Sequence, residues 1–306
     1  MANDTWGGMS ASINVNELTE LVRHAAQPQQ AMSQLANPPT GRALGLGRGD
    51  TVQYTFFPNM TTSGGELDEN DTIPAGSITP VKATYTVKEY GNSLTWTGKL
   101  EDLSRLTLED SFMKALMDDM QKLMNTQVYN QAKLTDYKAV FNSTGDEFVT
   151  NGTPTKTADQ DLSLANLSFV RRKAKANNIP LYDGESYVYV ADIDSSHSLQ
   201  DDSALTDILR EDSGRAALNG EIGRVKGCRV VEDNHKLAKA TGSLGEGFLF
   251  GADAVGHEVA LPWEIRREVK DFGRSIAVAY YGIMAWFKIM DQTTHSQEHI
   301  IHVTSA

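Results

Sequence analysis

Cysteine is nearly absent from the sequence: the chain of 306 residues has one, Cys228. One cysteine cannot form a disulfide within the chain, so the fold does not require an oxidising compartment. Cys228 begins an apolar stretch that ends at Val231, where we expect a buried and unreactive thiol. Disulfide bonds between subunits are not expected either.

Long hydrophobic runs and targeting signals are also missing. The longest apolar run, SIAVAYYGIMAWF at 275–287, is shorter than the roughly 20 residues that a membrane-spanning helix needs. The first residues, MANDTWGGMS, have neither a basic start nor an apolar core, so we expect no signal peptide. The sequence therefore predicts a soluble protein made in the cytoplasm, with no membrane partner.

Basic residues are fewer than acidic ones. The chain has 28 lysines and arginines and 40 aspartates and glutamates, so its net charge is -12. A surface of this sign repels nucleic acid and argues against a dedicated DNA-binding protein. With 40% hydrophobic residues and no excess of glycine or proline, the chain can bury a sizeable core. Its length suits about two domain-sized units.

Residues 1–50 have the character of an arm rather than a domain. Residues 14–27 fit one short helix with Leu18, Leu21 and Val22 on one side. The proline- and glycine-rich stretch that follows, at 38–49, breaks helices. An arm of this kind buries too little surface to fold alone, so we expect it to pack on something else, such as another subunit.

Residues 51–100 have strand character at both ends and none in the middle. The stretches 51–57 and 81–98 are rich in β-branched and aromatic residues. The residues between them, about twenty, show no convincing element, which suits a two-stranded ribbon that projects from the body. The tip of this ribbon carries four acids: Glu66, Asp68, Glu69 and Asp71.

The rest of the chain alternates helices and strands. Residues 108–133 follow a helical period, with Thr107 as N-cap. We expect the apolar stripe of this helix to pack in the core. Because the stripe is rich in methionine, it could also form a groove for a partner. The stripe consists of Phe112, Leu116, Met120, Leu123 and Met124, extended by Met113, Met117 and Val128.

Later segments complete an α+β pattern. Residues 164–179, behind the N-cap Ser163, and 203–214 fit helices, and 187–193 fit a buried strand. Residues 265–291 fit two long strands joined at 270–273, or a strand and a ribbon. This order of elements predicts an α+β chain with two long projections, the arm and the ribbon.

The stretch LNGEIGRVKGCRVVEDN at 218–234 raises the question of a phosphate-binding loop, because Gly220, Gly223 and Gly227 lie close together. The stretch lacks the G-x-x-x-x-G-K-[ST] spacing and precedes a strand instead of a helix. Glu221 would also repel a phosphate. We interpret it as a glycine-supported turn into a strand.

Histidines near the C-terminus have the spacing of metal ligands. His295, Glu298 and His299 match the H-x-x-E-H pattern of one class of zinc proteases, and His302 adds a further ligand type. The residues from His299 to Val303 have strand rather than helix character. We therefore favour a polar terminal strand over a zinc site.

Two further groups are weighed in the same way. Asp192, Asp194 and His197 follow a strand end and could bind a divalent ion, but a helix cap at Asp194 or Ser195 is the simpler interpretation. A basic helical face could contact phosphate, although a solvated face is simpler; it consists of Arg171, Arg172, Lys173 and Lys175. No catalytic constellation, metal or cofactor emerges.

The order of these segments resembles the major capsid proteins of tailed bacteriophages with the Hong Kong 97 fold, and more closely the coat-protein family of the N-four-like enquatroviruses. One motif is VKATYTVKEYGNSLTWTGKLEDLSR at 81–105, which leads into the long helix. The other is the glycine-rich stretch 218–234, similar to an "NGEIG…G.RFVE" segment of that family. The resemblance covers about residues 45–290.

The resemblance implies an α+β Hong Kong 97-type fold with four parts. Residues 1–50 would form an N-arm, and residues 51–100 would form an extended E-loop. The peripheral P-domain would consist of residues 101–160 and 262–306, with its spine helix at 108–133. The axial A-domain would consist of residues 161–261. The segment 270–274 would lie where capsomers meet. The loop with Gly220, Glu221, Gly223 and Gly227 would be an A-domain turn.

The function implied by the resemblance is that of a coat protein and not of an enzyme. It would self-assemble into pentamers and hexamers that close into an icosahedral virion shell around double-stranded phage DNA, which it would touch without sequence specificity. Scaffolding, portal and decoration proteins would be further partners, and synthesis would take place in the bacterial host cytoplasm. An encapsulin-like compartment and a small zinc enzyme built on the C-terminal histidines stay open as alternatives.

In such a shell the acidic ribbon tip would meet basic residues of a neighbouring subunit. The candidates are Arg105, Arg266, Arg267, Lys270 and Arg274. Exposed ion pairs contribute only about 0 to 1 kcal/mol each, so we expect apolar burial to supply most of the association energy.

Overall fold

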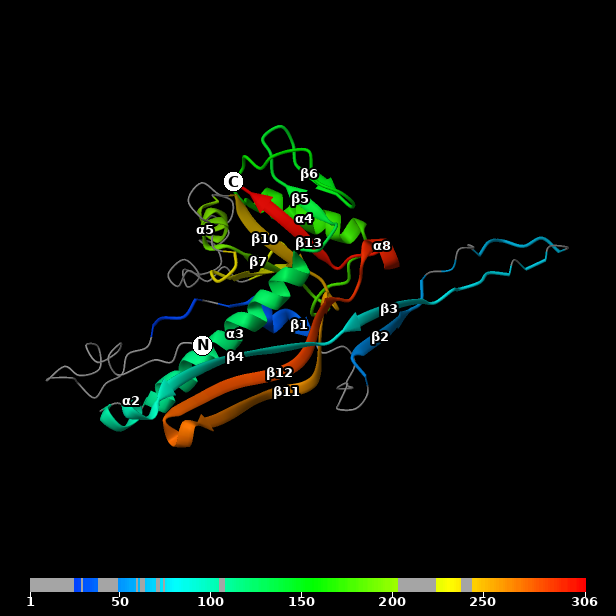
Figure 1. Cartoon of the computed structure of the whole chain (residues 1–306). Coiled ribbons are helices and arrows are strands. Elements are labelled where there is room, and N and C mark those ends of the chain that lie inside the picture. The colour runs from blue at the N-terminus through cyan, green and yellow to red at the C-terminus, as the bar shows by residue number, and fades with distance from the viewer. Residues whose placement is uncertain are drawn as a thin grey trace.

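The computed structural model describes residues 25–28, 30–37, 49–58, 60, 64–69, 72–73, 75–104, 108–202, 224–237 and 244–306. They form one part around a seven-stranded sheet, an elongated part around a four-stranded sheet, and a two-stranded ribbon that projects from where the two parts join (Figure 1). The fold is thus a mixture of helices and strands with a long projection. None of the helices within these ranges is long and apolar enough to cross a membrane.

Several predicted features lie outside the described residues. They are most of the helix at 14–27, the N-cap Thr107, the helix at 203–214, the acid Asp71, the base Arg105 and the loop residues Gly220, Glu221 and Gly223.

The four-stranded sheet, called the long sheet below, has the strand order β1-β11-β12-β4. β11 (Val255–Lys270) and β12 (Ser275–Lys288) run antiparallel and are joined by the short 3-10 turn η2 (Asp271–Gly273). This confirms the two long strands that the sequence predicts. β4 (Lys88–Thr97) pairs with β12 at one edge, and the two-residue β1 (Ala36–Asn37) pairs with β11 at the other.

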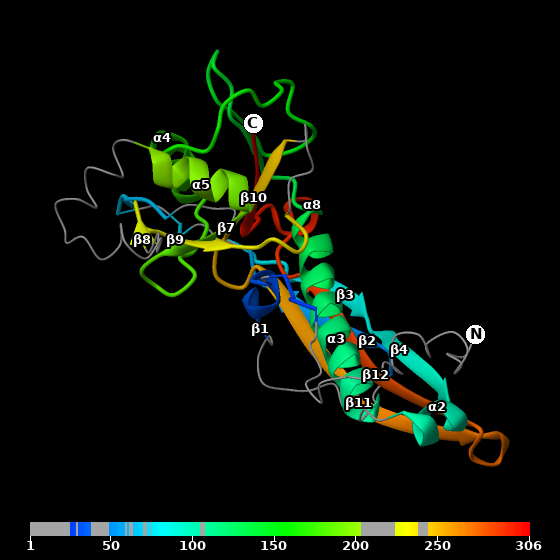
Figure 2. The ribbon, with the colours of Figure 1, turned by 90° about the vertical axis from the view of Figure 1, so that its left-hand side faces the viewer.

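One face of the long sheet is covered by the helix α3 (Leu108–Ala132), which follows the short helix α2 (Gly98–Leu103) (Figures 1 and 2). Leu116 of α3 packs with Trp96 of β4 and with Ile276, Val278 and Tyr280, which alternate along β12. The predicted core role of the apolar stripe is confirmed for most of its members. Met117 is the exception, with 47% of its surface exposed.

The seven-stranded sheet has the order β6-β5-β13-β10-β7-β9-β8. Its strands are β5 (Lys138–Val140), β6 (Glu147–Val149), β7 (Tyr187–Ala191), β8 (Arg224–Val225), β9 (Cys228–Glu232), β10 (Gly245–Phe250) and β13 (Ile300–Ser305). The helices α4 (Leu164–Ala176) and α5 (Ile193–Asp201) cover one face. The strand and helix predicted at 187–193 and 164–179 are confirmed, and the side chain of Ser163 caps α4 as expected.

The two faces of this sheet belong to two different cores, because side chains alternate along each strand. In β7, Tyr187 and Tyr189 face α4 and α5, whereas Val188 and Val190 face the C-terminal half of α3. The second core also includes Trp286 from the end of β12. α3 therefore spans both sheets and holds them as one body.

The turn between β8 and β9 answers the question of the glycine-rich stretch. Lys226 and Gly227 both have positive φ angles, 51° and 73°. The φ of Gly227 lies in the region that favours glycine, and a Cβ there would also displace the guanidinium of Arg171, whose Nη2 would be 2.7 Å away. The interpretation as a turn is confirmed at Gly227, and burial raises the pKa of the neighbouring Cys228 thiol to about 12, which fits an unreactive cysteine.

Candidate functional site

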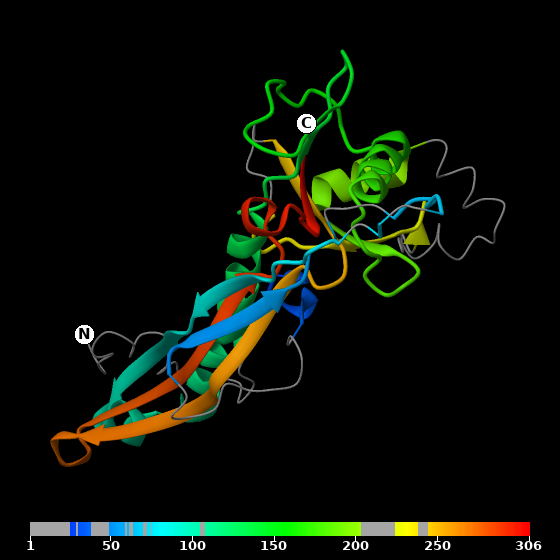
Figure 3. The same cartoon turned by 90° about the vertical axis from the view of Figure 1, so that its right-hand side faces the viewer.

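The ribbon is fixed to the body by stacked aromatic rings. Its strands β2 (Thr51–Phe56) and β3 (Val81–Thr86) are antiparallel and lie on the side of the long sheet opposite α3 (Figure 3). The ring of Tyr85 stacks on Phe287 of β12 with a centroid distance of 4.0 Å, and its hydroxyl donates to the carbonyl of Lys288 at 2.8 Å. Tyr54 donates to a carboxylate oxygen of Glu258 at 2.5 Å. Burial raises the pKa of both tyrosines, that of Tyr85 to about 12. Both hydroxyl groups therefore stay protonated and act as hydrogen-bond donors.

Beyond these strands the ribbon exposes apolar side chains. The exposed ones among the described residues are Phe57, Met60, Leu67, Ile73 and Ile78, with 67%, 54%, 45%, 75% and 46% of their surfaces accessible. The acids Glu66, Asp68 and Glu69 are also exposed at the end of this projection. A projection with this many exposed hydrophobic side chains is unfavourable in water unless a partner covers them.

The loop between β11 and β12, called the hairpin tip below (residues 269–275), is a second exposed projection. Phe272 is fully exposed, and its φ of 52° and that of Asp271, 51°, lie in the left-handed region that non-glycine residues rarely adopt. Val269 beside it is 56% exposed. An apolar ring at a strained, exposed turn has no role in the core, which marks the tip as a contact surface.

The four described basic residues that were predicted to receive the acidic ribbon tip already have partners in the same chain, and the fifth, Arg105, lies outside the described residues. Their ion pairs are Arg266 with Glu264 at 3.1 Å, Arg267 with Glu109 at 3.5 Å, Lys270 with Glu268 at 2.9 Å and Arg274 with Asp271 at 3.3 Å. The bases and acids interleave along the strand, so this edge is not a strongly basic patch. A neighbouring acid would have to compete with these exposed pairs.

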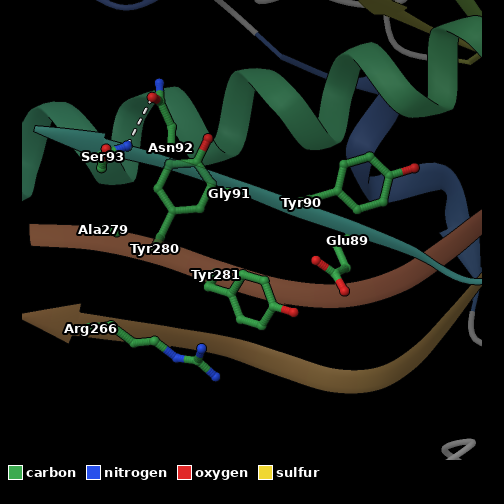
Figure 4. A pocket seen from close by; sticks show the side chains of 9 residues that line it. All are labelled: Glu89, Tyr90, Gly91, Asn92, Ser93, Arg266, Ala279, Tyr280 and Tyr281. Carbon is green, nitrogen blue, oxygen red and sulfur yellow. Dashed lines mark hydrogen bonds between the residues drawn. The ribbon is translucent and has the colours of Figure 1, made fainter. Parts of the chain in front are cut away.

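Two hollows lie on the long sheet. One, of about 580 Å³, opens on the face away from α3 near Glu89, Gly91 and Tyr281, and the guanidinium of Arg266 lies 4.3 Å from the ring centroid of Tyr281 (Figure 4). Gly91 allows the close approach of its neighbour, because a Cβ would lie 2.6 Å from the carbonyl oxygen of Tyr280. This hollow is wide and shallow, with no catalytic pair among its residues.

The other hollow, of about 280 Å³, is an apolar groove between α3 and β11. It is lined by Met113, Leu116, Met117 and Met120 on α3 and by Trp263 and Ile265 on β11, with Gln121, Glu264, Ala279 and Tyr280 at its borders. The alternative interpretation of the methionine stripe, a partner groove, thus has a structural counterpart in part of the helix.

The joint between the two sheets contains a buried ion pair. The ammonium of Lys288, at the end of β12, contacts the carboxylate of Glu298 and donates to the carbonyl of Leu134 at 3.1 Å. Glu298 is fully buried and also accepts from Thr135 and from the backbone N–H of Asp136 at 2.9 Å. These contacts connect β12, the end of α3 and the segment before β13.

The residues of the H-x-x-E-H match do not converge on a metal position. His295 ends the four-residue helix α8 (Gln292–His295), and Glu298 is held by the ion pair at the joint. Nδ1 of His299 donates to the carbonyl of Ala252 at 2.5 Å. No group of three histidine, cysteine or acidic side chains that could hold a metal occurs within the described ranges, so the geometry gives the zinc interpretation no support.

Asp192 caps α5, where the sequence suggested Asp194 or Ser195 as the cap. Its carboxylate accepts from the backbone N–H of Ser195 at 3.3 Å, because the helix begins one residue after the strand turns. The basic face of α4 packs on aromatic rings: Lys173 lies 5.4 Å from the ring centroid of Phe169. Asp192, Asp194 and His197 do not form a group of three metal-ligating side chains in the described part of the chain.

Sequence reasoning named the segment 270–274 through the family resemblance and Glu298 through the H-x-x-E-H match, but it missed Lys288 and the ion pair at the joint. Lys288 and Glu298 are ten positions apart with no shared pattern, so only folding brings them together. Phe272 also had a signal of its own, because an aromatic residue between charges and beside a glycine at a turn is rarely part of a core.

Comparison with known proteins identifies the fold. No family model and no curated protein sequence matches the chain. The capsid structure of the cyanophage P-SCSP1u matches with a TM-score of 0.70 at 13% identity, over 96% of this chain and 94% of that one. The capsid asymmetric unit of the cyanophage Pam1 gives 0.70 at 14% identity over 97% of each chain. The head structure of the Helicobacter pylori bacteriophage KHP40 gives 0.68 at 14% identity over 99% of each. The chain therefore shares the fold of these phage capsid structures over nearly its whole length.

Proposed function

We propose that the protein is the major capsid protein of a tailed bacteriophage, which forms pentamers and hexamers and closes into an icosahedral shell around double-stranded DNA. The observation that carries the proposal is the likeness to three phage capsid and head structures over at least 94% of both chains. The role is structural rather than enzymatic. The projecting ribbon and hairpin tip, with their exposed apolar side chains, are the surfaces that such assembly needs.

In this proposal the parts of the molecule correspond to those of a Hong Kong 97-type subunit. The ribbon would be the E-loop, the long sheet with α3 the P-domain, the seven-stranded sheet with α4 and α5 the A-domain, and residues 1–50 the N-arm. The pairing of β4 with β12 favours an E-loop that ends near Val87 rather than at residue 100. The pairing of β13 with β10 and β5 favours an A-domain that includes these C-terminal and central strands.

Contacts between subunits would be mainly apolar. The exposed ribbon residues, such as Phe57 and Ile73, would be covered by a neighbouring subunit. The acids Glu66, Asp68 and Glu69, with Asp71, would add a smaller electrostatic part, because the bases of the hairpin region are already paired and exposed. Arg105 remains a further candidate partner.

The finer identity follows the sequence resemblance. We place the chain near the enquatrovirus coat proteins, in the virion capsid after synthesis in the host cytoplasm, with scaffolding, portal and decoration proteins as partners. The net charge of -12 fits containment of DNA by non-specific contact better than tight binding. The matched structures named above are those of phages, which favours a phage coat over an encapsulin-like compartment.

Negative-stain electron microscopy of the purified full chain, with size-exclusion chromatography beside it, tests the proposal. We expect closed shells, sheets or capsomer rings, and nuclease-protected DNA in particles recovered from infected cells. A subunit that stays monomeric with scaffold candidates and crowding agents would contradict the proposal. Particles that contain a protein cargo and no nucleic acid would instead identify a compartment shell.

A further inference from the structure

The N-terminal part of the chain lies against the same two elements, α3 and β11, that line the apolar groove. The 3-10 turn η1 (Met32–Leu35) lies against α3, and β1 pairs with β11 at Val255 and Gly256 (Figure 2). The backbone N–H of Ser33 donates to the side-chain oxygen of Asn125 at 3.1 Å. The methionine-lined groove lies farther along these two elements, at Met113 to Met120 of α3, and no residue of η1 or β1 lines it.

The chemistry of the groove suits one face of a short amphipathic helix. Its walls are mainly thioether, aliphatic and aromatic groups, with Gln121 and Glu264 as the polar lining residues, and Met117 and Ile265 are 47% and 54% exposed. Methionine side chains adapt to the shape of a partner helix, which docks through anchors spaced three, four and seven residues apart. From Met113 to Met120 the groove follows seven positions of α3, which is about 10 Å at 1.5 Å per residue.

A segment of matching length lies just upstream of η1. Residues 14–22, which lie outside the described residues, have the sequence NVNELTELV with apolar Val15, Leu18 and Val22 at helical spacing. Val15 and Val22 are also seven positions apart, about 10 Å in a helix. Val22 and Ala31 are nine positions apart, and nine positions span up to about 30 Å. The backbone N–H of Ala31 donates to the carboxylate of Asp233 at 2.9 Å. Asn125 and Met117 are only about 12 Å apart along α3, so the groove is within reach.

We propose that residues 14–22 fold as a helix into the groove of their own chain, with Val15, Leu18 and Val22 against the methionines of α3. The short tether makes the event intramolecular and raises the effective concentration of the segment at the groove. The inference concerns the isolated subunit and does not rest on the proposed shell, so the two can fail separately.

Trypsin provides a direct test, because Arg23 is the only lysine or arginine before Arg42. In the full-length unassembled chain we expect cleavage after Arg23 to be at least about tenfold slower than in a free peptide of residues 12–30. Met117→Glu, which places a charge in the groove, should remove most of this protection, whereas Ala115→Glu, an exposed position of α3 that does not line the groove, should keep it. Equal cleavage of the full-length chain and the free peptide would overturn the proposal without any variant.

Cysteine cross-linking then identifies whose segment is bound. With Leu18→Cys and Met117→Cys in one chain we expect an oxidised product that migrates as a monomer, since the native Cys228 is buried and does not compete. Leu18→Cys with Ala115→Cys is the matched control and should cross-link far less. Equal yields from the two pairs, or a product found only as a dimer, would refute docking within one chain.

Discussion

Buried charge at the joint gives single side chains a large effect on this fold. Glu298 is fully buried, and its only ion pair among the described residues is with Lys288, which is 7% exposed and also lies 3.2 Å from Asp291. Loss of Lys288 therefore leaves the buried carboxylate of Glu298 without a cation, and breaking a buried pair in this way commonly costs about 3 to 5 kcal/mol. The pair and its hydrogen bonds also define how the end of β12 meets the segment before β13.

We therefore expect Lys288→Met to lower the free energy of unfolding by about 3 to 5 kcal/mol. Chemical denaturation of the unassembled subunit measures this loss. Glu268→Ala breaks the exposed pair with Lys270 and should change stability by no more than about 0.5 kcal/mol. A loss below about 1 kcal/mol for Lys288→Met would show that the joint tolerates the unpaired carboxylate of Glu298.

The carboxyl group of Glu246 makes stability depend on acid pH. The imidazole of His302, 3.6 Å from its carboxylate, the hydrogen bond donated by Tyr129 and the charge of Lys133 lower its pKa from 4.5 to about 2. Because the folded-state pKa is the lower one, the ionised group stabilises the fold above pH 4.5, and this contribution is lost as the pH falls from 4.5 towards 2.

Replacement of this group should consequently matter most near neutral pH. We expect Glu246→Gln to reduce the free energy of unfolding at pH 7, and the difference from the natural chain to shrink as the pH falls from 5 to 2. Urea titrations at a series of pH values measure it. A difference that stays constant over this range would mean that the pKa of Glu246 is not lowered in the folded protein.

Gly227 is the residue on which the β8–β9 turn depends. Its φ of 73° and the contact with Arg171 both oppose a side chain. We expect Gly227→Ala to cost roughly 1 to 3 kcal/mol of stability, measured by thermal unfolding. Gly64→Ala is the control, since a Cβ there meets nothing within 4 Å, and an equal effect of both substitutions would contradict the argument.

Among the elements, the ribbon shows which features of a strand the local sequence pattern can predict. The alternation of Tyr85 with threonines predicted a strand at 81–98, and strands occupy nearly all of that range. Only the structure divides them at Val87, because β3 pairs with β2 in the ribbon whereas β4 pairs with β12 in the long sheet. The partner of a strand depends on the tertiary structure. The same local pattern therefore predicts both strands but does not show that they belong to different sheets.

The ring of Phe287 anchors this element to the body. Phe287→Ala removes the stack on Tyr85 and the contact with Tyr54, so we expect faster hydrogen exchange across β2 and β3 and a loss of about 3 to 5 kcal/mol in stability. Exchange mass spectrometry resolves the ribbon peptides. Phe169→Ala on α4 is the control and should leave hydrogen exchange in the ribbon unchanged. If ribbon exchange in Phe287→Ala were as slow as in the natural chain, the anchoring role would be contradicted.

For the whole molecule, the exposed apolar residues of the ribbon predict an assembly defect that leaves folding intact. Ile73 is 75% exposed, so Ile73→Asp should leave the thermal midpoint of the subunit unchanged while it slows or blocks shell formation. Light scattering during assembly measures the rate. Thr84→Asp, on an exposed polar position of β3, is the matched control.

Charge reversal at Glu66, Asp68, Glu69 and Asp71 should have a smaller, salt-dependent effect on the same rate. If reversal abolished assembly while Ile73→Asp did not, the electrostatic part of the contact would be the dominant one. Normal assembly of both variants would remove the ribbon from the contact altogether.

The sequence by itself determined the elements: the long helix, the hairpin of two long strands, the capped α4, the buried β7 and the ribbon strands. These follow from local period, capping and turn chemistry, which act over a few residues. The tertiary structure decided which strands share a sheet, that Lys288 meets Glu298, that Met117 is exposed at a groove whereas Leu116 is buried beneath it, and that the hairpin bases are already paired. Such outcomes depend on contacts between segments far apart in the chain, where no short pattern carries information.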